Sequence, residues 1–365
     1  MAANPQGQEA VAVEPLLPEL IMEILLRLPV KALLRFQYVS KQVHSLISGA
    51  DFAKRYLQGG FSGRVLLSSW RHFRLQSLDY EALIRNRDEN PALQNLQAPP
   101  EMGPNRPAHI LGSCNGLVSI SMCLDWTIFI WNPSLGNYRI IQDSSLNGCS
   151  YGFGYDCSTD DYKIIKVFVD KGFKPAIVEV FSLRANSWKH YQSNKSFKSE
   201  LADKVGTLAS GSIYWLAKYA RGDLGSYIIY FDVSKEELGY IPVPYSGCAE
   251  GWRLGVLGGC LSACFSLSGK DAKVWWMNNG RDAEDPWVEL GTVPKPEEAG
   301  NIRDYLVPLC FASNGGALMI KGGLRLYVCN LKKNTCKSIY VYDDQNEFQG
   351  ALLVESLVNP NDYGA

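Results

Sequence analysis

The sequence predicts a mainly β protein in which a short three-helix head is followed by a β-propeller. Two observations lead to this fold class. Apolar residues follow helical spacing before residue 58 and strand-like spacing after residue 62, and the second part repeats with a period near 50 residues. The length of 365 residues suits two domains, and 46% hydrophobic residues allow a large core. We expect a loose tail at 1–14, the head at 15–58 and the propeller at 62–360.

One apolar stripe predicts the first helix of the head. Its members share the spacing of a single helical face, and they are Leu17, Leu20, Ile21, Ile24, Leu25 and Leu28. Pro18 suits the first turn of that helix, and Pro29 ends it or opens the next one. The second helix carries Val30, Leu33, Leu34 and Phe36. Ser40 can cap the third, which carries Val43, Leu46 and Ile47.

The head is too apolar for its size. Burying about ten of these side chains contributes roughly 15–30 kcal/mol. Ordering about 40 residues costs roughly 40–80 kcal/mol of backbone entropy. We therefore expect the head to bury its apolar stripe against a partner, which is either its own body or another protein.

Repeated strand units predict the propeller. Each unit is an aromatic strand, a polar turn and a return strand, and the aromatic residues Trp131, Phe181, Phe231, Trp276 and Tyr327 mark successive units. A period near 50 residues with four strands in each unit is typical of a kelch-like β-propeller. Five units are visible, residues 64–80 are a candidate start of a sixth, and the blade number stays open. No helix of convincing length is expected here, and residues 85–109 read as a long loop with five prolines.

The last apolar segment of the chain is expected to close the ring. Residues 350–358 are strand-like and stand apart from their neighbours. A propeller removes its free edges when one end of the chain completes a blade begun by the other end. We interpret residues 350–358 as that closing strand.

Composition excludes several functions. Lys and Arg number 36 against 37 Asp and Glu, which argues against a nucleic-acid binder. Glu23 and Arg27 interrupt the first apolar segment, so it is not a signal peptide, and the longest uncharged run, 254–269, is shorter than the about 20 residues of a membrane span. We expect no membrane partner and a cytoplasmic or nuclear location. The ten cysteines form no C-x-x-C pair, so we expect buried free thiols rather than zinc ligands or a disulfide framework.

Catalytic motifs are weak. Residues 148–152 match G-x-S-x-G, but the motif needs a helix after the serine and strand-like residues follow instead. The acidic segment 156–161 lacks the glycine of a calcium loop and reads as a hairpin turn capped by its own Asp side chains. No phosphate-binding loop is present. We therefore predict no catalytic residue, no metal and no cofactor.

A few residues are candidates for a binding surface on the propeller. Most aromatic residues recur at matching positions and are expected in the core. Trp252 is the exception, because it lies in a Gly-rich stretch outside a clear strand, and we predict an exposed anchor there with Arg253 beside it. Arg281 lies in another candidate loop, 280–287. Solvated loops without a partner are the alternative.

Both parts of the chain resemble known domains. The head is similar to an F-box in Leu17-Pro-Glu-Leu20, Ile24-Leu25, Arg27-Leu-Pro-Val-Lys31, Leu33-Leu-Arg-Phe36, Val39-Ser-Lys41 and Leu46-Ile47. The body resembles the F-box-associated domain of plant F-box proteins in Ser113-Cys-Asn-Gly-Leu117, Ile130-Trp-Asn-Pro133, Phe153-Gly-Tyr-Asp156, Gly211-Ser-Ile-Tyr-Trp-Leu216 and Val354-Glu-Ser-Leu-Val358. The two resemblances together span most of the chain.

The resemblance implies a substrate receptor without catalytic activity. The head is then expected to bind the Skp-type adaptor of a cullin-based ubiquitin ligase, and the body to bind an unknown protein substrate. The implied adaptor-binding residues are Leu17, Pro18, Leu20, Ile21, Ile24, Leu25, Leu28, Pro29, Val30, Leu33, Leu34, Phe36 and Val39. The chain departs from the family pattern at Val43, where Trp is common, and at 49–51, where Asp-Pro is absent. The alternatives are an F-box scaffold outside any ligase and a propeller-type ligand-binding or glycan-binding protein.

Overall fold

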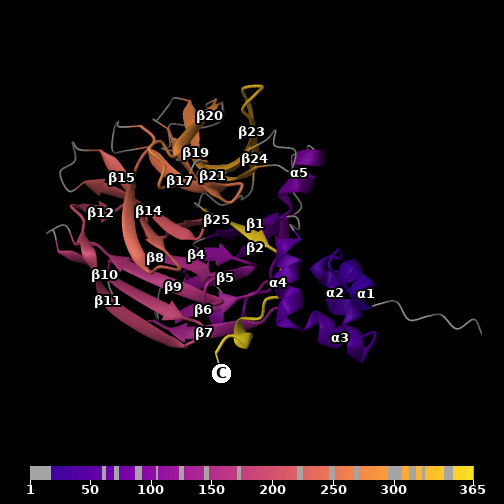
Figure 1. Ribbon diagram of the computed structural model, residues 1–365. Coiled ribbons are helices and arrows are strands. Elements are labelled where there is room, and N and C mark those ends of the chain that lie inside the picture. Colours follow the sequence, from indigo (N-terminus) through magenta and orange to yellow (C-terminus); the bar gives the residue numbers. More distant parts are fainter. Residues whose placement is uncertain are drawn as a thin grey trace, which may run out of the picture. The chain divides into compact units, whose positions relative to one another are not determined.

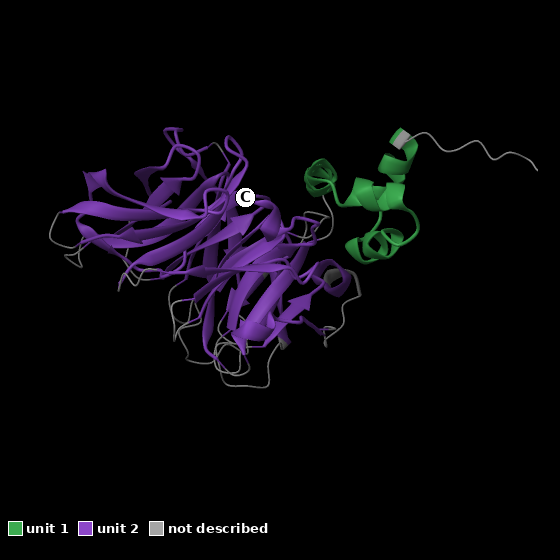
Figure 2. Ribbon diagram, turned by 90° about the horizontal axis from the view of Figure 1, so that it is seen from below, with its two compact units in different colours: residues 1–60 green, residues 61–365 purple. Residues whose placement is uncertain are grey.

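The computed structural model confirms the mainly β fold with a helical head. The chain divides into two compact units, residues 1–60 and 61–365 (Figure 2). The structure describes residues 18–59, 63–69, 74–86, 93–103, 106–122, 127–143, 148–170, 174–219, 225–245, 251–266, 271–278, 280–294, 306–311, 318–322, 325–340 and 348–364. The predicted tail at 1–14 lies outside these ranges. None of the helices within them is long and apolar enough to cross a membrane.

The described residues of the first unit form four helices rather than the three predicted. They are α1 (Pro18–Leu25), α2 (Val30–Phe36), α3 (Lys41–Ile47) and α4 (Ala50–Gln58). Ser40 caps α3 as expected, because its hydroxyl accepts a hydrogen bond from the backbone N–H of Val43 at 3.2 Å. The missed helix α4 has a narrow buried face, formed by Phe52, Ala53 and Tyr56. Its remaining residues are mostly polar, so the apolar pattern alone was too sparse to predict it.

The second unit is a propeller whose described strands form six sheets (Figure 1). Along the chain, five of the sheets contain β4 (Ala108–Cys114) to β7 (Tyr138–Gln142), β8 (Ser150–Asp156) to β11 (Ser187–Ser196), β12 (Ser199–Leu201) to β16 (Glu237–Pro242), β17 (Trp252–Leu257) to β20 (Trp287–Val293), and β21 (Leu306–Phe311) to β24 (Thr335–Tyr340). Neighbouring strands within each sheet are antiparallel. The blade number that the repeats left open is therefore six.

The intermediate strands of these five sheets continue the same up-and-down order. These strands are β5 (Leu117–Met122), β6 (Thr127–Trp131), β9 (Asp161–Phe168), β10 (Pro175–Ser182), β13 (Thr207–Ala209), β14 (Ser212–Tyr219), β15 (Ser226–Asp232), β18 (Cys260–Phe265), β19 (Ala272–Met277), β22 (Leu318–Gly322) and β23 (Arg325–Asn330). One sheet has five strands, because β12 and β13 both pair with β14, at opposite ends of it.

The sixth sheet closes the ring with the end of the chain. It contains β25 (Phe348–Val354), β1 (Gly63–Ser69), β2 (Leu75–Leu78) and β3 (Leu93–Asn95), in that order. Strand β25 pairs antiparallel with β1 from Gly63 opposite Val354 to Ser69 opposite Phe348. The predicted closing strand is confirmed, although it begins two residues earlier and ends at Val354 rather than at residue 358.

The stretch after β2 differs from the prediction. Helix α5 (Tyr80–Asn86) follows β2, where no helix was expected. The segment 85–109, predicted as a loop, contains β3, a short 3-10 helix at Pro100–Met102 and the start of β4. The Asp79 side chain accepts a hydrogen bond from the Ala82 backbone N–H at 2.9 Å, so it caps the first turn of α5.

The core of the propeller lies between neighbouring blades. One cluster joins β9 and β10 to β14 and β15, with Val178, Trp215 and Phe231 fully or almost fully buried. Another joins β14 and β15 to β17 and β19, and it contains Trp252 and Trp275. Each blade therefore packs its faces on its neighbours, as a radial arrangement of sheets requires.

The cysteines differ from the prediction of buried free thiols at one disulfide pair, at the exposed Cys157 and at the half-buried Cys114 and Cys260. Cys329 and Cys336 lie directly opposite each other on β23 and β24 and form a disulfide with a Cα–Cα distance of 4.0 Å. Among the other described cysteines, Cys149, Cys264 and Cys310 are buried free thiols, as expected. The register of the hairpin, which the spacing in sequence does not reveal, brings the pair together.

Candidate protein-interaction sites

The predicted adaptor-binding residues divide into a buried and an exposed set. Leu25, Val30 and Leu33 are buried, so their side chains stabilise the head and are not accessible to a partner. Leu20, Ile24, Phe36 and Val39 remain 49%, 54%, 42% and 69% exposed, and Pro29 is exposed too. Ile21, Leu28 and Leu34 are half-buried. Leu17 lies outside the described residues, and Pro18 opens α1.

Packing inside the head explains this division. The Tyr56 hydroxyl on α4 donates a hydrogen bond to the Leu28 carbonyl at 2.9 Å, which ties α4 to the turn between α1 and α2. The same helix contributes the buried ring of Phe52. Helix α4 thus contacts one side of the apolar stripe of the head. The other side remains accessible.

The exposed apolar residues of the head form a defined set, which we call the apolar face. It consists of Leu20, Ile24, Phe36, Tyr38 and Val39. Tyr38 was not predicted, although it is 91% exposed; the only signal for it is an aromatic residue beside Val39 in the turn after α2. Among the described residues, the other large apolar side chains at comparable exposure are Ile140, Tyr240, Tyr245 and Val288. The head, a sixth of the chain, therefore carries more than half of them, which makes it the candidate interaction surface.

A groove lies beside α1 and α3 at the position of the unusual valine. It encloses about 460 Å³ and is lined by residues that include Ile21, Met22, Val43, Leu46 and Phe52. Val43 is half-buried in its wall. The groove is therefore an apolar space that a larger side chain at position 43 would enter.

The innermost strands of the propeller surround a channel. It encloses about 820 Å³, and β4, β17, β21 and β25 line it together with residues 203–208. Apolar side chains such as Ile110, Leu254 and Leu352 form much of its wall. Polar side chains from different blades also line it: His109, Asp203, Arg253, Lys321 and Gln349. A pocket of this size and composition is typical of a ligand-binding site.

The structure corrects the prediction for Trp252. This residue begins β17, is fully buried, and packs on Phe265 and Trp275 with ring centroids 4.8 and 5.3 Å away. It is a core residue and not an exposed anchor. Gly251, just before it, has a positive φ, and Gly255 lies where β17 approaches the Pro308 carbonyl; these glycines interrupt the apolar strand pattern. Arg253, the next residue, is half-buried and lines the channel.

Arg281 is also engaged within the protein. It lies between β19 and β20, pairs with the Asp232 carboxylate and the Ser212 hydroxyl, and covers the Tyr230 ring at 4.6 Å. Its side chain is only 18% exposed. The residue links two blades, and its predicted role in substrate binding stays a prediction.

The weak catalytic motifs have structural roles. Ser150 is buried in β8, and its hydroxyl donates to the Asp203 carbonyl at 2.7 Å, with no helix following. The Asp156 carboxylate accepts hydrogen bonds from the Ser158 N–H at 2.9 Å and the Lys163 ammonium at 2.8 Å, which confirms the self-capped hairpin. No group of three or more His, Cys, Asp or Glu side chains among the described residues is placed to hold a metal.

The buried thiols are poor nucleophiles. Burial raises the pKa of Cys114, Cys264 and Cys310 to about 12. A thiol with such a pKa stays protonated at neutral pH, whereas covalent catalysis needs the thiolate. Cys264 and Cys310 therefore act as small apolar side chains in the core, whereas Cys114 is half-buried and lines the channel.

Sequence comparisons define the class of protein. The model of the F-box domain matches residues 15–55, and the model of the F-box associated beta propeller domain matches residues 69–357. The second match alone spans more than half of the chain. The chain therefore belongs to the F-box proteins that carry an F-box-associated β-propeller.

Individual relatives agree with this family. The chain is 28% identical over 377 residues to F-box protein CPR1 of Arabidopsis thaliana, covering 93% of this chain and 88% of the relative. It is 28% identical over 367 residues to the F-box/kelch-repeat protein At3g23880 of the same plant, covering 94% and 95%. Among solved structures, TolB from Acinetobacter baumannii aligns with 83% of this chain and 70% of its own, with a TM-score of 0.49 and 14% identity.

Proposed function

We propose that this protein is the non-catalytic substrate-recognition subunit of a Skp-cullin-F-box ubiquitin ligase. In this proposal the apolar face of the head binds the Skp-type adaptor, the adaptor connects to the cullin, and the propeller binds a protein substrate. The ligase acts in the cytoplasm, the nucleus or both. The exposure of Leu20, Ile24 and Phe36 in a family-typical F-box is the observation that carries the proposal.

The energetics favour a partner of substantial size. Burying the five side chains of the apolar face contributes roughly 1.5–3 kcal/mol each at most. Association costs roughly 4–15 kcal/mol in lost freedom. The apolar face alone thus comes close to balancing that cost, and a stable complex needs the half-buried residues Ile21, Leu28 and Leu34 or polar contacts in addition.

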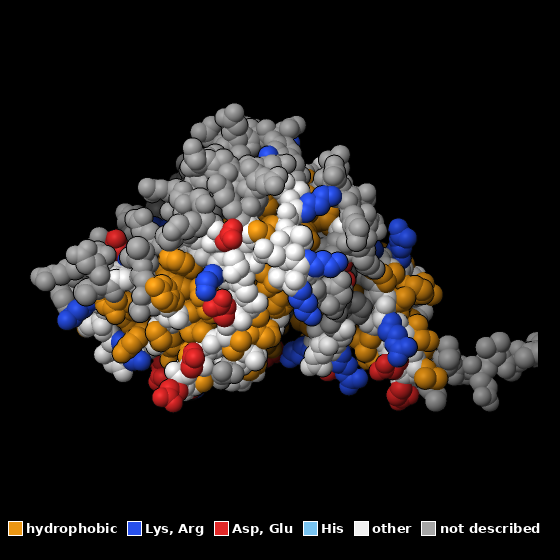
Figure 3. Space-filling model, turned by 90° about the horizontal axis from the view of Figure 1, so that it is seen from above, with side chains coloured by type: hydrophobic (Ala, Val, Ile, Leu, Met, Phe, Trp, Pro, Cys, Tyr) orange, Lys and Arg blue, Asp and Glu red, His pale blue; other side chains and the backbone are white. Residues whose placement is uncertain are grey.

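The mixed surface charge fits a protein partner better than a nucleic acid. The described acidic and basic side chains intermix with hydrophobic ones on the face that Figure 3 shows. The net charge of the whole chain is −1. A surface without a basic excess releases few counterions from a polyanion, so we propose no nucleic-acid partner.

A pull-down with purified Skp-type adaptor tests the proposal. The full chain should retain the adaptor, and the double variant Ile24→Glu with Phe36→Ala should lose it, because both side chains are exposed and leave the head folded. The matched control is Tyr240→Glu, at a 66% exposed apolar residue of the propeller. Failure of the intact chain to bind would leave the alternative of a scaffold outside any ligase.

A further inference from the structure

Three cations of the head have no ion-pair partner among the described residues. They are Lys31 and Arg35 on α2 and Lys41 at the start of α3, and we call them the basic set. All three are exposed, and no hydrogen bond or ion pair joins their side chains to another described residue. The other two arginines of the head, Arg27 and Arg55, lie 3.9 and 3.1 Å from a carboxylate oxygen four residues away. Residues 28–50 contain neither Asp nor Glu, so the basic set has no such neighbour in its own part of the chain.

The head carries a positive charge that the chain as a whole does not have. Residues 18–59 contain six Lys or Arg and three Asp or Glu, a net charge of +3, whereas the 365 residues together have a net charge of −1. Charges of one sign gathered on a small unit create a potential that attracts a partner of the opposite sign. The basic set accounts for this potential, because the other three cations are matched in number by the three carboxylates.

The basic set lies next to the apolar face. Arg35 directly precedes Phe36, and Lys41 follows Val39 by two residues. Lys31 lies one helical turn before Arg35, on the same side of α2. A polar rim around an apolar centre is the usual anatomy of a protein interface. Basic segments that bind anionic membranes typically contain about four to eight Lys or Arg, so three cations beside an apolar face favour a protein with an acidic surface.

We propose that Lys31, Arg35 and Lys41 steer association with the Skp-type adaptor by attracting an acidic surface that borders the apolar contact. The inference rests on the proposed function and deepens it, because it states the charge of the partner surface that meets the head. Exposed ion pairs add little affinity, whereas attraction at a distance raises the association rate constant. The basic set therefore acts chiefly on the association rate constant, and the apolar face on the dissociation rate constant.

Stopped-flow mixing of the full chain with purified Skp-type adaptor tests this role. The association rate constant should fall at least about tenfold between about 0.1 M and about 1 M salt, because the Debye length shrinks from about 10 Å to about 3 Å. The double variant Lys31→Glu with Arg35→Glu should associate at least about tenfold more slowly at the lower salt concentration, with a dissociation rate constant changed by less than about threefold. At the higher salt concentration the association rate constants of the variant and the original chain should agree. The milder variant Lys31→Gln with Arg35→Gln should show a smaller effect in the same direction.

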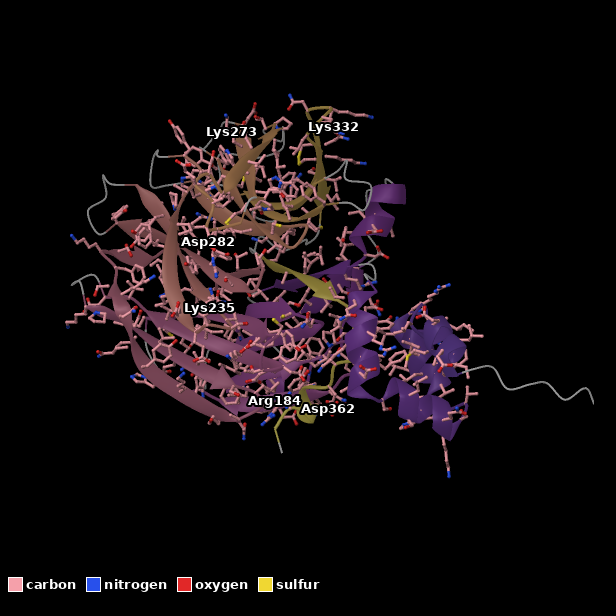
Figure 4. The ribbon with its side chains drawn as sticks, viewed as in Figure 1. Arg184, Lys235, Lys273, Asp282, Lys332 and Asp362 are labelled. Carbon is pink, nitrogen blue, oxygen red and sulfur yellow. A yellow bond between two sulfur atoms is a disulfide. The ribbon has the colours of Figure 1, made fainter. Side chains whose placement is uncertain are left out.

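The matched control reverses the same charge elsewhere. Lys235 and Lys332 lie in exposed turns, between β15 and β16 and between β23 and β24 (Figure 4), and the double variant Lys235→Glu with Lys332→Glu should associate as fast as the original chain does. Equal slowing in the two charge-reversed variants would be an effect of net charge alone and would overturn the proposal. Thermal melting of each variant shows that it is folded.

The salt series separates this proposal from the proposed function. An intact chain that binds the adaptor at a rate independent of salt would contradict only the role of the basic set. An intact chain that binds no adaptor at either salt concentration would contradict the ligase function and this inference with it. Vesicles of phosphatidylcholine and phosphatidylserine and a single-stranded oligonucleotide probe the other anionic partners. If either retains the intact chain but not the charge-reversed variant of the basic set, and association with the adaptor does not depend on salt, the basic set is assigned to that anionic partner and the proposal is overturned.

Discussion

Gly255 lies on the innermost strand β17, where the next blade comes close. A Cβ atom added at this position would be 2.1 Å from the carbonyl oxygen of Pro308 on β21, and backbone cannot move aside as a flexible side chain can. We expect Gly255→Ala to lower the free energy of unfolding by about 1–3 kcal/mol or more. Urea unfolding measures the change.

Gly350 provides the control for this prediction. It lies on β25, another innermost strand, and its added Cβ would be 3.7 Å from the Leu309 side chain, an ordinary contact. Gly350→Ala should therefore change the stability by less than 1 kcal/mol or so. Equal effects of the two substitutions would contradict the close approach of the blades at Gly255.

Val43 tests the groove in the head. Its replacement Val43→Trp should fill the apolar groove beside Ile21 and Phe52 and enlarge the contact with the adaptor. We expect the dissociation constant for the adaptor to fall about tenfold, the effect of roughly 1.4 kcal/mol of added contact. Titration with purified adaptor measures it. Val288→Trp, at a 37% exposed position of the propeller, is the control and should change nothing.

The pKa of the Asp156 carboxyl lets us predict how the free energy of unfolding depends on pH. Burial alone would raise the pKa of its carboxyl, but hydrogen bonds from Lys163, Ser158 and Thr159 outweigh burial and hold the pKa well below its usual range. A lowered pKa in the folded state stabilises the fold above the unfolded value near 3.8, and this stabilisation is lost as the pH falls through the folded value. We expect stability to decline below about pH 5.

The variant Asp156→Asn should be less stable at pH 7, by about 1–3 kcal/mol, and should lose less on acidification. Urea unfolding at pH 7, 5 and 4 compares the two proteins. The control is Asp282→Asn, at an exposed residue, which should follow the pH dependence of the original chain. Parallel curves for Asp156→Asn and the original chain would contradict the role of this carboxylate.

Among the elements, the segment after β25 extends the ring closure. Residues 355–363 leave the sheet and contact the neighbouring sheet of β4 to β7, and Leu357 and Val358 are buried. The side-chain amide of Asn132 donates to the Val358 carbonyl at 2.7 Å, and Arg139 donates to the Tyr363 carbonyl. This segment therefore fastens the closing strand to the sheet of β4 to β7.

A truncation tests that segment. Removing residues 355–365 should lower the free energy of unfolding by about 3–6 kcal/mol, because two buried apolar side chains and several hydrogen bonds disappear. Asn132→Ala should also destabilise the chain. The two changes remove the same hydrogen bonds. The loss of stability in the combined variant should therefore be smaller than the sum of the two separate losses. If urea unfolding shows that the two losses of stability are fully additive, the contact between Asn132 and the terminal segment is contradicted.

In the head, the spacing of apolar residues predicts helices, but packing decides which of their side chains are buried. The stripe and both prolines predict α1 and α2 well, because helical spacing is a local property. Helix α4 escaped prediction, and within the head Leu25 and Leu33 are core while Leu20 and Ile24 are surface. The predicted adaptor-binding set therefore contains both core and surface residues, and its role in binding the adaptor stays a prediction.

At the scale of the whole molecule, the ring of six sheets explains which polar residues from different blades come into contact. Asp232 and Arg281 come from different blades and meet only because neighbouring blades pack face to face. The channel wall likewise contains Arg253 and Lys321 from two blades. Each of these residues looks like an ordinary loop or strand residue in its own repeat.

The amino-acid sequence by itself determined the helical head, the repeating strand units, the closing strand and the family to which they belong. These features depend on local spacing, turn residues and period, which are visible along the chain. Only the tertiary structure decided the number of blades, the burial of Trp252, the disulfide between Cys329 and Cys336, and the residues that line the channel. Alternation along a strand defines two faces, but neighbours distant in sequence decide which face is covered.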